Sequence, residues 1–352
     1  MELRGRQART TVCGLGDGVG VIAANRRVVL LEYVSVADRI AVFGVRADWE
    51  QPQVVVLDVD RLDLSLFVAA NFDSHRSVRD LADMPELWHA YDLLVQPLAS
   101  WSDPGDIICL VPYGPLHSLP LHALRVGEAY LIERNPVTYV PSVSALQHSL
   151  TARPGAALEA PRRTAFFGDS QRNLPHAAAE AAMLGDLFGV EAYLGEKVTR
   201  QSVGQALATV DVVHIAGHAR FDPVDPLESG LQLAGGDVLT ASDIFGMPRV
   251  QASLVTLSGC ETGVSHYQPG DELIGLTRAF LYARAASVLV SLWSVADDST
   301  SFFMRRFYEH LMHTPGVAKV DALQAAILDT MEVPTWRSLH HWAPFVMVGD
   351  WR

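Results

Sequence analysis

Apolar residues change their spacing near the middle of the chain. After residue 163, short apolar runs alternate with segments in which apolar residues recur every three or four positions, a pattern typical of strands alternating with amphipathic helices. Strands are predicted at residues 164–167, 191–194, 212–215, 253–257, 287–292 and 344–348, and helices at residues 177–188, 200–208, 272–285, 299–312 and 318–331. This alternation predicts a doubly wound, mostly parallel α/β sheet with helices on both faces.

The first half of the chain has the pattern of a smaller α/β unit. Two β-branched runs, at residues 27–34 and 39–45, flank the short polar break of residues 35–38 and predict a β-hairpin. A strand at residues 54–59, helices at residues 62–72 and 77–98, and a strand at residues 106–111 follow. The Pro- and Ala-rich stretch at residues 151–163 is typical of a linker. We therefore expect an N-terminal segment (residues 1–26), a first lobe (residues 27–155) and a second unit (residues 156–352).

Composition and charge narrow the classes of partner. Hydrophobic residues make up 49% of the 352 residues and charged residues 19%, which favours a folded globular protein over a disordered one. The formal net charge of −13 argues against nucleic-acid partners and against anionic lipid surfaces, and favours basic partners. No apolar run reaches the 18 or so residues of a spanning helix, and no apolar run directly follows the arginines near the N-terminus. We expect a cytoplasmic protein without membrane insertion.

Cysteines and histidines give no metal pattern. Cys13, Cys109 and Cys260 are an odd number at wide spacing, which fits neither a disulfide framework nor a four-ligand zinc site. His117 and His122 lie five residues apart with a proline between them, so they do not share one helix face. We expect no metal and no cofactor, and a structural role for both histidines.

Two apolar strands in the second half each lead to a reactive side chain. The run VVHIAGH ends at His218 and the run SLVTLSGC ends at Cys260. Chemistry in an open parallel sheet gathers at the carboxyl ends of the strands, and adjacent strands lie about 4.8 Å apart, so the two side chains can act as base and nucleophile. The alternative is a buried structural thiol beside a packed histidine. His214, inside the strand, is the competing base, and we assign it a structural role.

The same segments resemble those of CHAT-domain proteins, a caspase-like family that is often fused to tetratricopeptide repeats. The histidine motif is HIAGHARFDP at residues 214–223 and the cysteine motif is LSGCETG at residues 257–263. Further matching segments lie at residues 92–98, 111–120, 131–134, 237–243, 270–281, 291–300 and 342–349. The resemblance extends over residues 28–350.

The resemblance implies a caspase-hemoglobinase-like fold preceded by a pseudo-protease lobe, as in separase, and cysteine endopeptidase activity. The family's catalytic histidine falls on His218 and its nucleophile on Cys260, with the N–H groups of Ala219 and Cys260 as the oxyanion hole. The segment containing Asp297 resembles the separase segment whose aspartate receives a substrate arginine, which implies a basic residue before the cut. The alternative for Asp297 is to cap the helix that follows it.

The chain departs from the family pattern after the histidine. Glycine is usual there, and Ala219 would be strained if the position needs a positive φ. An inactive pseudoprotease that binds a partner peptide is therefore the alternative function. The resemblance also implies a role in bacterial defence or signalling, with a gasdermin-like protein as one candidate substrate and a separate activating or inhibiting protein.

Overall fold

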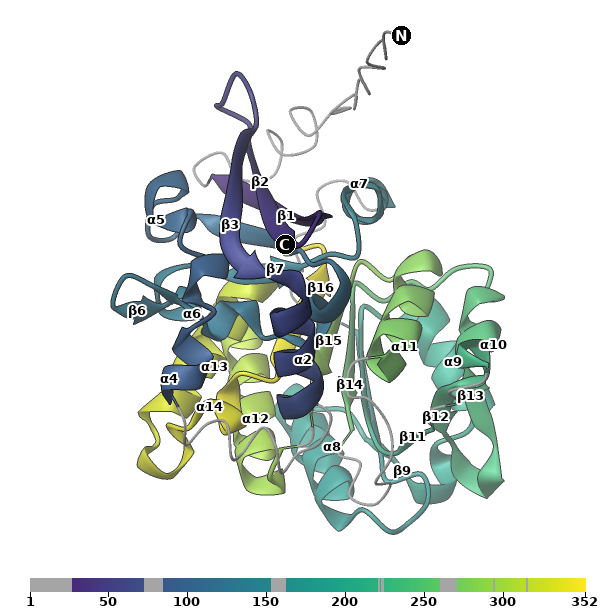
Figure 1. Ribbon diagram of the computed structural model, residues 1–352. Helices are drawn as coiled ribbons and strands as arrows, with labels where there is room; N and C mark the ends of the chain where they lie inside the picture. Colours follow the sequence, from purple (N-terminus) through teal and green to yellow (C-terminus); the bar gives the residue numbers. More distant parts are fainter. Residues whose placement is uncertain are drawn as a thin grey trace, which may run out of the picture.

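An eleven-stranded sheet runs through the whole molecule (Figure 1). The computed structural model describes residues 27–72, 85–152, 163–220, 222, 225–259, 271–293, 295–314 and 316–352. The strand order is β3-β2-β1-β4-β7-β16-β15-β14-β10-β8-β9. In chain order the strands are β1 (Val28–Val36), β2 (Arg39–Arg46), β3 (Gln53–Asp60), β4 (Ile107–Val111), β7 (Val137–Tyr139), β8 (Thr164–Gly168), β9 (Tyr193–Leu194), β10 (Val212–Ala216), β14 (Leu254–Ser258), β15 (Ser287–Ser291) and β16 (Phe345–Gly349).

Two parallel halves meet in this sheet. Strands β9, β8, β10, β14 and β15 run parallel to one another, and so do strands β1, β4, β7 and β16. The halves join where β15 and β16 run antiparallel. At the far end of the first half, β2 is antiparallel to β1, and β3 is antiparallel to β2. The predicted mostly parallel sheet is confirmed. The sheet is also continuous between the two lobes expected from the sequence, because β16 pairs with β7 as well as with β15.

Helices cover both faces of the sheet. The helices are α2 (Arg61–Asn71), α4 (Pro85–His89), α5 (Leu98–Trp101), α6 (Leu131–Arg134), α7 (Val143–Ala152), α8 (Pro175–Phe188), α9 (Arg200–Thr209), α10 (Ala241–Phe245), α11 (Asp271–Tyr282), α12 (Asp297–His313), α13 (Lys319–Glu332) and α14 (Leu339–Trp342). Side chains of β10 and β14 contact α8 and α12 on one face, and Phe303 of α12 stacks on Phe345 with ring centroids 3.7 Å apart. Helix α13 packs beside α12. No helix in the described part of the chain is long and apolar enough to span a bilayer.

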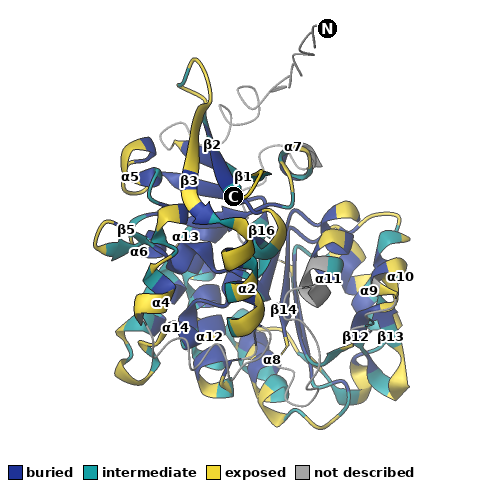
Figure 2. Cartoon of the chain, viewed as in Figure 1, coloured by how far each residue is buried: buried dark blue, intermediate teal, exposed yellow. Residues whose placement is uncertain are grey.

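The central strands of the second half are buried along their whole length (Figure 2). Local sequence features set the ends of the helices around them. Pro175 begins α8, where its missing N–H costs nothing, and Gly189 ends that helix with φ +67°, which glycine adopts without strain. Thr199 caps α9 by accepting a hydrogen bond from the Ser202 N–H.

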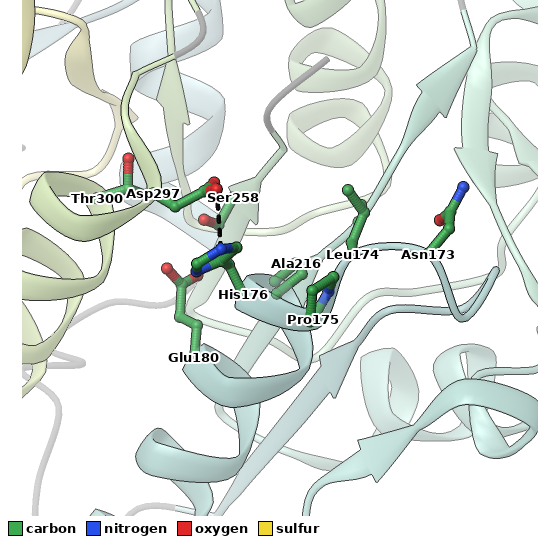
Figure 3. A pocket seen from close by; sticks show the side chains of 11 residues that line it. Asn173, Leu174, Pro175, His176, Glu180, Ala216, Ser258, Asp297 and Thr300 are labelled. Carbon is green, nitrogen blue, oxygen red and sulfur yellow. Dashed lines mark ion pairs between the residues drawn. The ribbon is translucent and has the colours of Figure 1, made fainter. Parts of the chain in front are cut away.

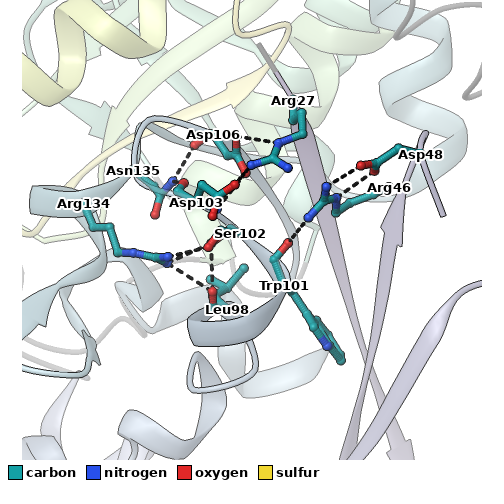
Figure 4. Close-up of polar contacts among 10 residues, drawn as sticks. All are labelled: Arg27, Arg46, Asp48, Leu98, Trp101, Ser102, Asp103, Asp106, Arg134 and Asn135. Atoms are coloured by element: carbon teal, nitrogen blue, oxygen red, sulfur yellow. Dashed lines mark hydrogen bonds and ion pairs between the residues drawn. The ribbon is translucent and has the colours of Figure 1, made fainter.

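A polar network ties the first hairpin to the rest of the first lobe (Figure 4). Arg46 donates to the Trp101 carbonyl at 2.8 Å and also pairs with Asp48. Arg134 donates to the Ser102 hydroxyl at 2.8 Å. These contacts connect strand β2, helix α5 and helix α6 across long sequence distances.

The helix predicted at residues 77–98 is wrong over its described part. The chain there forms α4, then the 3-10 turn η1 (Asp92–Leu94), and α5 starts only at residue 98. Pro97 cannot donate a backbone hydrogen bond and its ring excludes a continuous helix. The Asp92 side chain instead accepts from the Arg125 N–H at 2.8 Å, which fixes the break.

Candidate active site

Strands β10 and β14 lie next to each other, as the sequence predicted. They are parallel, with Ala216 opposite Ser258. The Gly217 N–H donates to the Ser258 carbonyl at 3.0 Å, so the pairing continues one residue past the end of β10. His218 is the next residue, at the carboxyl edge of the sheet.

The turns that follow the two strands touch backbone to backbone. A Cβ atom built on Gly259 would lie 2.9 Å from the Gly217 carbonyl oxygen, closer than real Cβ contacts. Gly259 therefore permits a close approach that a side chain would prevent. Cys260 lies outside the described residues. The residues directly before His218 and before Cys260 are thus in contact.

His218 has a hydrogen-bond partner in the loop after β8. Its Nε2 atom lies 3.1 Å from Oδ1 of Asn173. An amide oxygen only accepts, so this contact assigns the imidazole proton to Nε2 and leaves the Nδ1 lone pair available as a base. The position of Asn173 is fixed because its backbone N–H donates to Asp169 Oδ1 at 2.8 Å.

Ala219 starts a small second sheet formed by β11 (Ala219–Arg220), β12 (Gly230–Gln232) and β13 (Val238–Thr240). Ala219 pairs with Leu231, and beside that pair the Gln232 N–H donates to the His218 carbonyl at 2.9 Å. Hydrogen-bonded and non-hydrogen-bonded pairs alternate along antiparallel strands. The pair of Ala219 and Leu231 is therefore a non-hydrogen-bonded one, and the Ala219 N–H points away from β12. The residue is not among those with positive φ, so the strain considered from the sequence is absent at Ala219.

A cavity of about 180 Å³ lies beside these strand ends (Figure 3). Its lining residues are Asn173, Leu174, Pro175, His176, Ala177, Glu180, Ala216, Gly217, Ser258, Asp297 and Thr300. Two carboxylates, from Glu180 and Asp297, contribute to the wall. Thr300 also contributes to the wall, although its hydroxyl oxygen is buried. The cavity therefore has an acidic wall.

Asp297 is the first residue of α12, not its cap. The capping position is Ala296, which provides no side-chain hydrogen bond. The Asp297 carboxylate instead lies 3.6 Å from the His176 Nε2 at the cavity. The geometry leaves Asp297 available to a ligand in the cavity.

Glu180 is a site residue that the sequence analysis missed. It is 4% exposed, and its Oε1 lies 3.0 Å from the Nε2 of the fully buried His214. Behind them, the Tyr308 hydroxyl lies 3.4 Å from His214 Nδ1 and 2.8 Å from the Thr256 hydroxyl. Burial raises the pKa of Tyr308, so the phenol stays protonated. The structural role expected for His214 is therefore seen, as the partner that holds Glu180.

Of the remaining cysteine and histidine candidates, Cys109 and His122 lie in the core, His117 is half-buried, and Cys13 lies outside the described residues. Cys109 is fully buried in β4, and burial raises the pKa of its thiol, which makes it unreactive. His122 is also buried, with its Nδ1 2.8 Å from the Tyr139 hydroxyl. No group of three or more His, Cys, Asp or Glu side chains in the described part of the chain is placed to hold a metal ion.

The sheet, the strand-end histidine and the adjoining cysteine motif define a caspase-like α/β protein. Residues 85–350 match the CHAT domain, so the chain belongs to the CHAT-domain family. It is 26% identical to tetratricopeptide repeat protein 28 of Mus musculus and of Homo sapiens over 327 residues, which covers 76% of this chain. The chain spans only 13% of the length of these relatives.

Solved structures support the same fold. Separase in the separase–securin complex of Saccharomyces cerevisiae is similar with a TM-score of 0.67 at 11% identity. The match covers 95% of this chain and 30% of that chain. The caspase-like fold expected from the CHAT resemblance is thereby confirmed, including the first lobe, since the match extends over nearly the whole chain.

Proposed function

We propose that the protein is a cysteine endopeptidase in which His218 and Cys260 form the catalytic dyad. The observation that carries the proposal is the backbone contact between Gly217 and Gly259, because it brings together the residues directly before the two reactive side chains. The hydrogen bond from His218 to Asn173 leaves Nδ1 as the basic nitrogen. A base beside a thiol generates the thiolate that acyl transfer requires.

The proposed reaction gives each of these residues a role. His218 Nδ1 takes the proton of the Cys260 thiol, and the thiolate forms a bond to the substrate carbonyl carbon. The N–H groups of Ala219 and Cys260 donate to the developing oxyanion. The C–N bond then breaks, the leaving amine takes the proton from His218, and water hydrolyses the thioester to release the acid and restore the thiol.

The cavity beside the dyad suits a basic side chain before the cut. Two carboxylates, Asp297 and Glu180, line its wall. A guanidinium can bind a carboxylate through two charge-assisted hydrogen bonds, whereas an ammonium acts as a point charge. We therefore expect cleavage after arginine and less efficient cleavage after lysine.

Covalent labelling tests the dyad. A peptide chloromethyl ketone with arginine at its reactive end should alkylate Cys260 in the wild type and react at least about tenfold more slowly with His218→Ala. Cys260→Ala should abolish labelling and cleavage, while Cys109→Ala, the matched control, should retain both. Cleavage by Cys260→Ala would exclude the dyad.

A fluorogenic panel that varies the residue before the cut tests the cavity. Arginine peptides should be cleaved at least about tenfold better than leucine or aspartate peptides, and Asp297→Ala should reduce that preference. A preference for neutral residues would exclude the assignment of Asp297. Tight binding of arginine peptides by a wild type that neither cleaves them nor labels would instead support the pseudoprotease adaptor.

The substrate and setting complete the proposal. We propose a protein substrate with a basic residue in an exposed loop, cut in the cytoplasm, with a gasdermin-like protein as one candidate in bacterial defence. Co-incubation of that candidate with the wild type and with Cys260→Ala tests this. Cleavage by the wild type alone would support it, and an intact candidate would exclude it.

A further inference from the structure

Strand β3 lies at the edge of the large sheet and is largely exposed (Figures 1 and 2), and three of its consecutive residues are exposed valines. Val54 is 52% exposed, Val55 38% and Val56 59%. Strand β2 pairs with one side of β3, and no other strand of the described chain pairs with its outer side. Because adjacent residues point to opposite faces, both faces of this segment present apolar surface.

The centre of β3 lacks the features that usually protect an edge strand. Natural edges are shortened, bulged, or interrupted by lysine or proline, because free N–H and C=O groups invite another strand. This strand is eight residues long. Its only break in register with β2 lies at the far end, between Arg39 and Ile40, and Pro52 comes before the strand begins. Residues 53–57 therefore offer an open template for pairing.

Strand β2, which pairs with β3, is packed firmly against helix α5. Arg46, near the end of β2, donates to the Trp101 carbonyl of α5 (Figure 4) and lies 5.1 Å from the centre of the Trp49 ring. The Trp49 and Trp101 rings pack edge to face with centroids 5.9 Å apart. A Cβ at Gly44 would overlap the Trp101 ring, so strand β2 lies directly against α5. A fixed edge pairs with less loss of conformational entropy than a mobile one.

The flanks of the exposed valines are acidic. Residues 50–60 contain Glu50, Asp58 and Asp60 and no basic residue. The Asp58 side chain is 88% exposed, although it pairs with Arg39 of β2. The protein as a whole carries a formal charge of −13. The edge therefore attracts basic side chains at both ends of its apolar centre.

Charge disfavours a second copy of this chain as the occupant in two of the three registers centred on the exposed valines. An antiparallel self-pair centred on Val55 would place Glu50 opposite Asp60, and one centred on Val54 would place Glu50 opposite Asp58. Like charges directly across a strand pair are destabilising. A partner with lysine or arginine at those positions removes this penalty.

We propose that β3 binds an extended segment of a partner protein by strand addition. The segment has alternating apolar residues at its centre and basic residues on both sides. Backbone hydrogen bonds to residues 53–57 provide affinity, and the acidic flanks select the partner. This surface is separate from the dyad and its cavity, and the proposal holds whether or not the protein is a peptidase.

The binding test uses a designed peptide and the Cys260→Ala protein, so that cleavage cannot interfere. The probe is a fluorescent peptide of about ten residues with alternating valine and threonine at its centre and lysines at both ends. It should bind in anisotropy titrations and slow amide hydrogen exchange in residues 53–57. A peptide with glutamates in place of the lysines should bind at least about tenfold more weakly.

Matched variants locate the site. The double variant Val54→Lys and Val56→Lys places charge on the exposed edge and should weaken binding at least about tenfold. Leu66→Lys changes an equally exposed apolar residue on α2 and should leave binding within about twofold. Asp297→Ala should also leave it unchanged, which excludes binding in the acidic cavity.

Four outcomes would overturn the proposal. These are no binding of the lysine peptide, equal binding of the glutamate peptide, unchanged binding by the double variant, and protection confined to residues outside 53–57. Concentration-dependent dimers of the wild type that the double variant abolishes would assign the edge to a second copy instead.

Discussion

Replacing His214 by alanine should destabilise the fold and largely preserve its chemistry, whereas replacing His218 should do the reverse. The two histidines lie four residues apart on one strand and its continuation. His214 is fully buried against Glu180, whereas His218 is partly exposed at the sheet edge, where its side chain bonds to Asn173. The pair therefore offers a direct separation of stability from catalysis.

The expected change in the free energy of unfolding depends on which groups each substitution leaves without a partner. His214→Ala leaves the carboxylate of Glu180, 4% exposed, without its partner. Breaking a buried ion pair or charged hydrogen bond from one side costs about 3–5 kcal/mol. With an unfolding entropy of about 2.1 cal/mol/K per residue, a chain of this length should lose about 4–7 °C in Tm. His218→Ala removes one hydrogen bond at a partly solvated site and should cost less than about 1 kcal/mol.

Urea or thermal unfolding, followed by circular dichroism, measures the first effect, and cleavage of an arginine peptide well below Tm measures the second. His218→Ala should lose at least about a hundredfold in kcat, while His214→Ala should stay within about tenfold of the wild type. The double variant His214→Leu and Glu180→Leu should recover most of the lost stability, because no charge remains unpaired. His313→Ala, at an exposed histidine in the last turn of α12 and outside the cavity lining, is the control for both assays. An unchanged Tm for His214→Ala would refute the argument.

Three further substitutions test individual contacts. Gly259→Ala should lower kcat about tenfold, because its Cβ would push apart the turns after β10 and β14. Gly217→Ala is the control and should keep the wild-type kcat, because its Cβ would meet nothing closer than 3.9 Å. Equal kcat values for the two variants would contradict the contact between the turns. Burial lowers the pKa of His122 to about 3, so the unfolded state binds an extra proton below about pH 6.5 and the free energy of unfolding falls as the pH drops towards 3. In urea titrations, His122→Phe should therefore lose about 2 kcal/mol less stability than the wild type between pH 7.5 and 5. The same loss in both proteins would contradict this. Ala37 has φ +55° in the hairpin turn, so Ala37→Gly should raise the free energy of unfolding by up to about 1 kcal/mol in urea titrations, and a decrease would show that no strain is stored there.

The second half of the fold could be predicted from the sequence because its strands are short, apolar and separated by regular helices. Strand β10 and helix α8 begin and end within about two residues of their predicted limits. Strand β7 has only three residues, and β11 only two, too few for any alternation to be visible. Such strands are stabilised by neighbours distant in the sequence. The wrong helix at residues 77–98 shows the opposite error, in which suitable apolar spacing is overridden by Pro97.

The residues of the candidate site also fall into one group that the sequence predicted and one that it did not. The sequence predicted the position of His218 because the carboxyl ends of parallel strands converge whatever the details of the loops. Asn173 and Glu180 come from the loop and helix after β8, and only the folded sheet brings them beside β10. Glu180 left one trace in the sequence, an acidic residue beside the buried Ala181 and Leu184 of the apolar stripe of α8. An ionisable group in such a stripe needs a buried partner. His214, the histidine inside a neighbouring strand, was the residue that could provide it.

The candidate site depends on both halves of the sheet, although its residues lie in the second. Asp297 begins α12, and that helix is fixed to the sheet where Phe303 stacks on Phe345 of β16. On its other side β16 pairs with β7 of the first lobe, where the buried Thr138 hydroxyl donates to the Gly349 carbonyl at 3.0 Å. The strand that positions the acidic cavity is thus the strand that joins the halves. If the proposed dyad is correct, loosening the first lobe should therefore disturb substrate selection before it disturbs cleavage chemistry, because the turns after β10 and β14 are held together by their own separate contact.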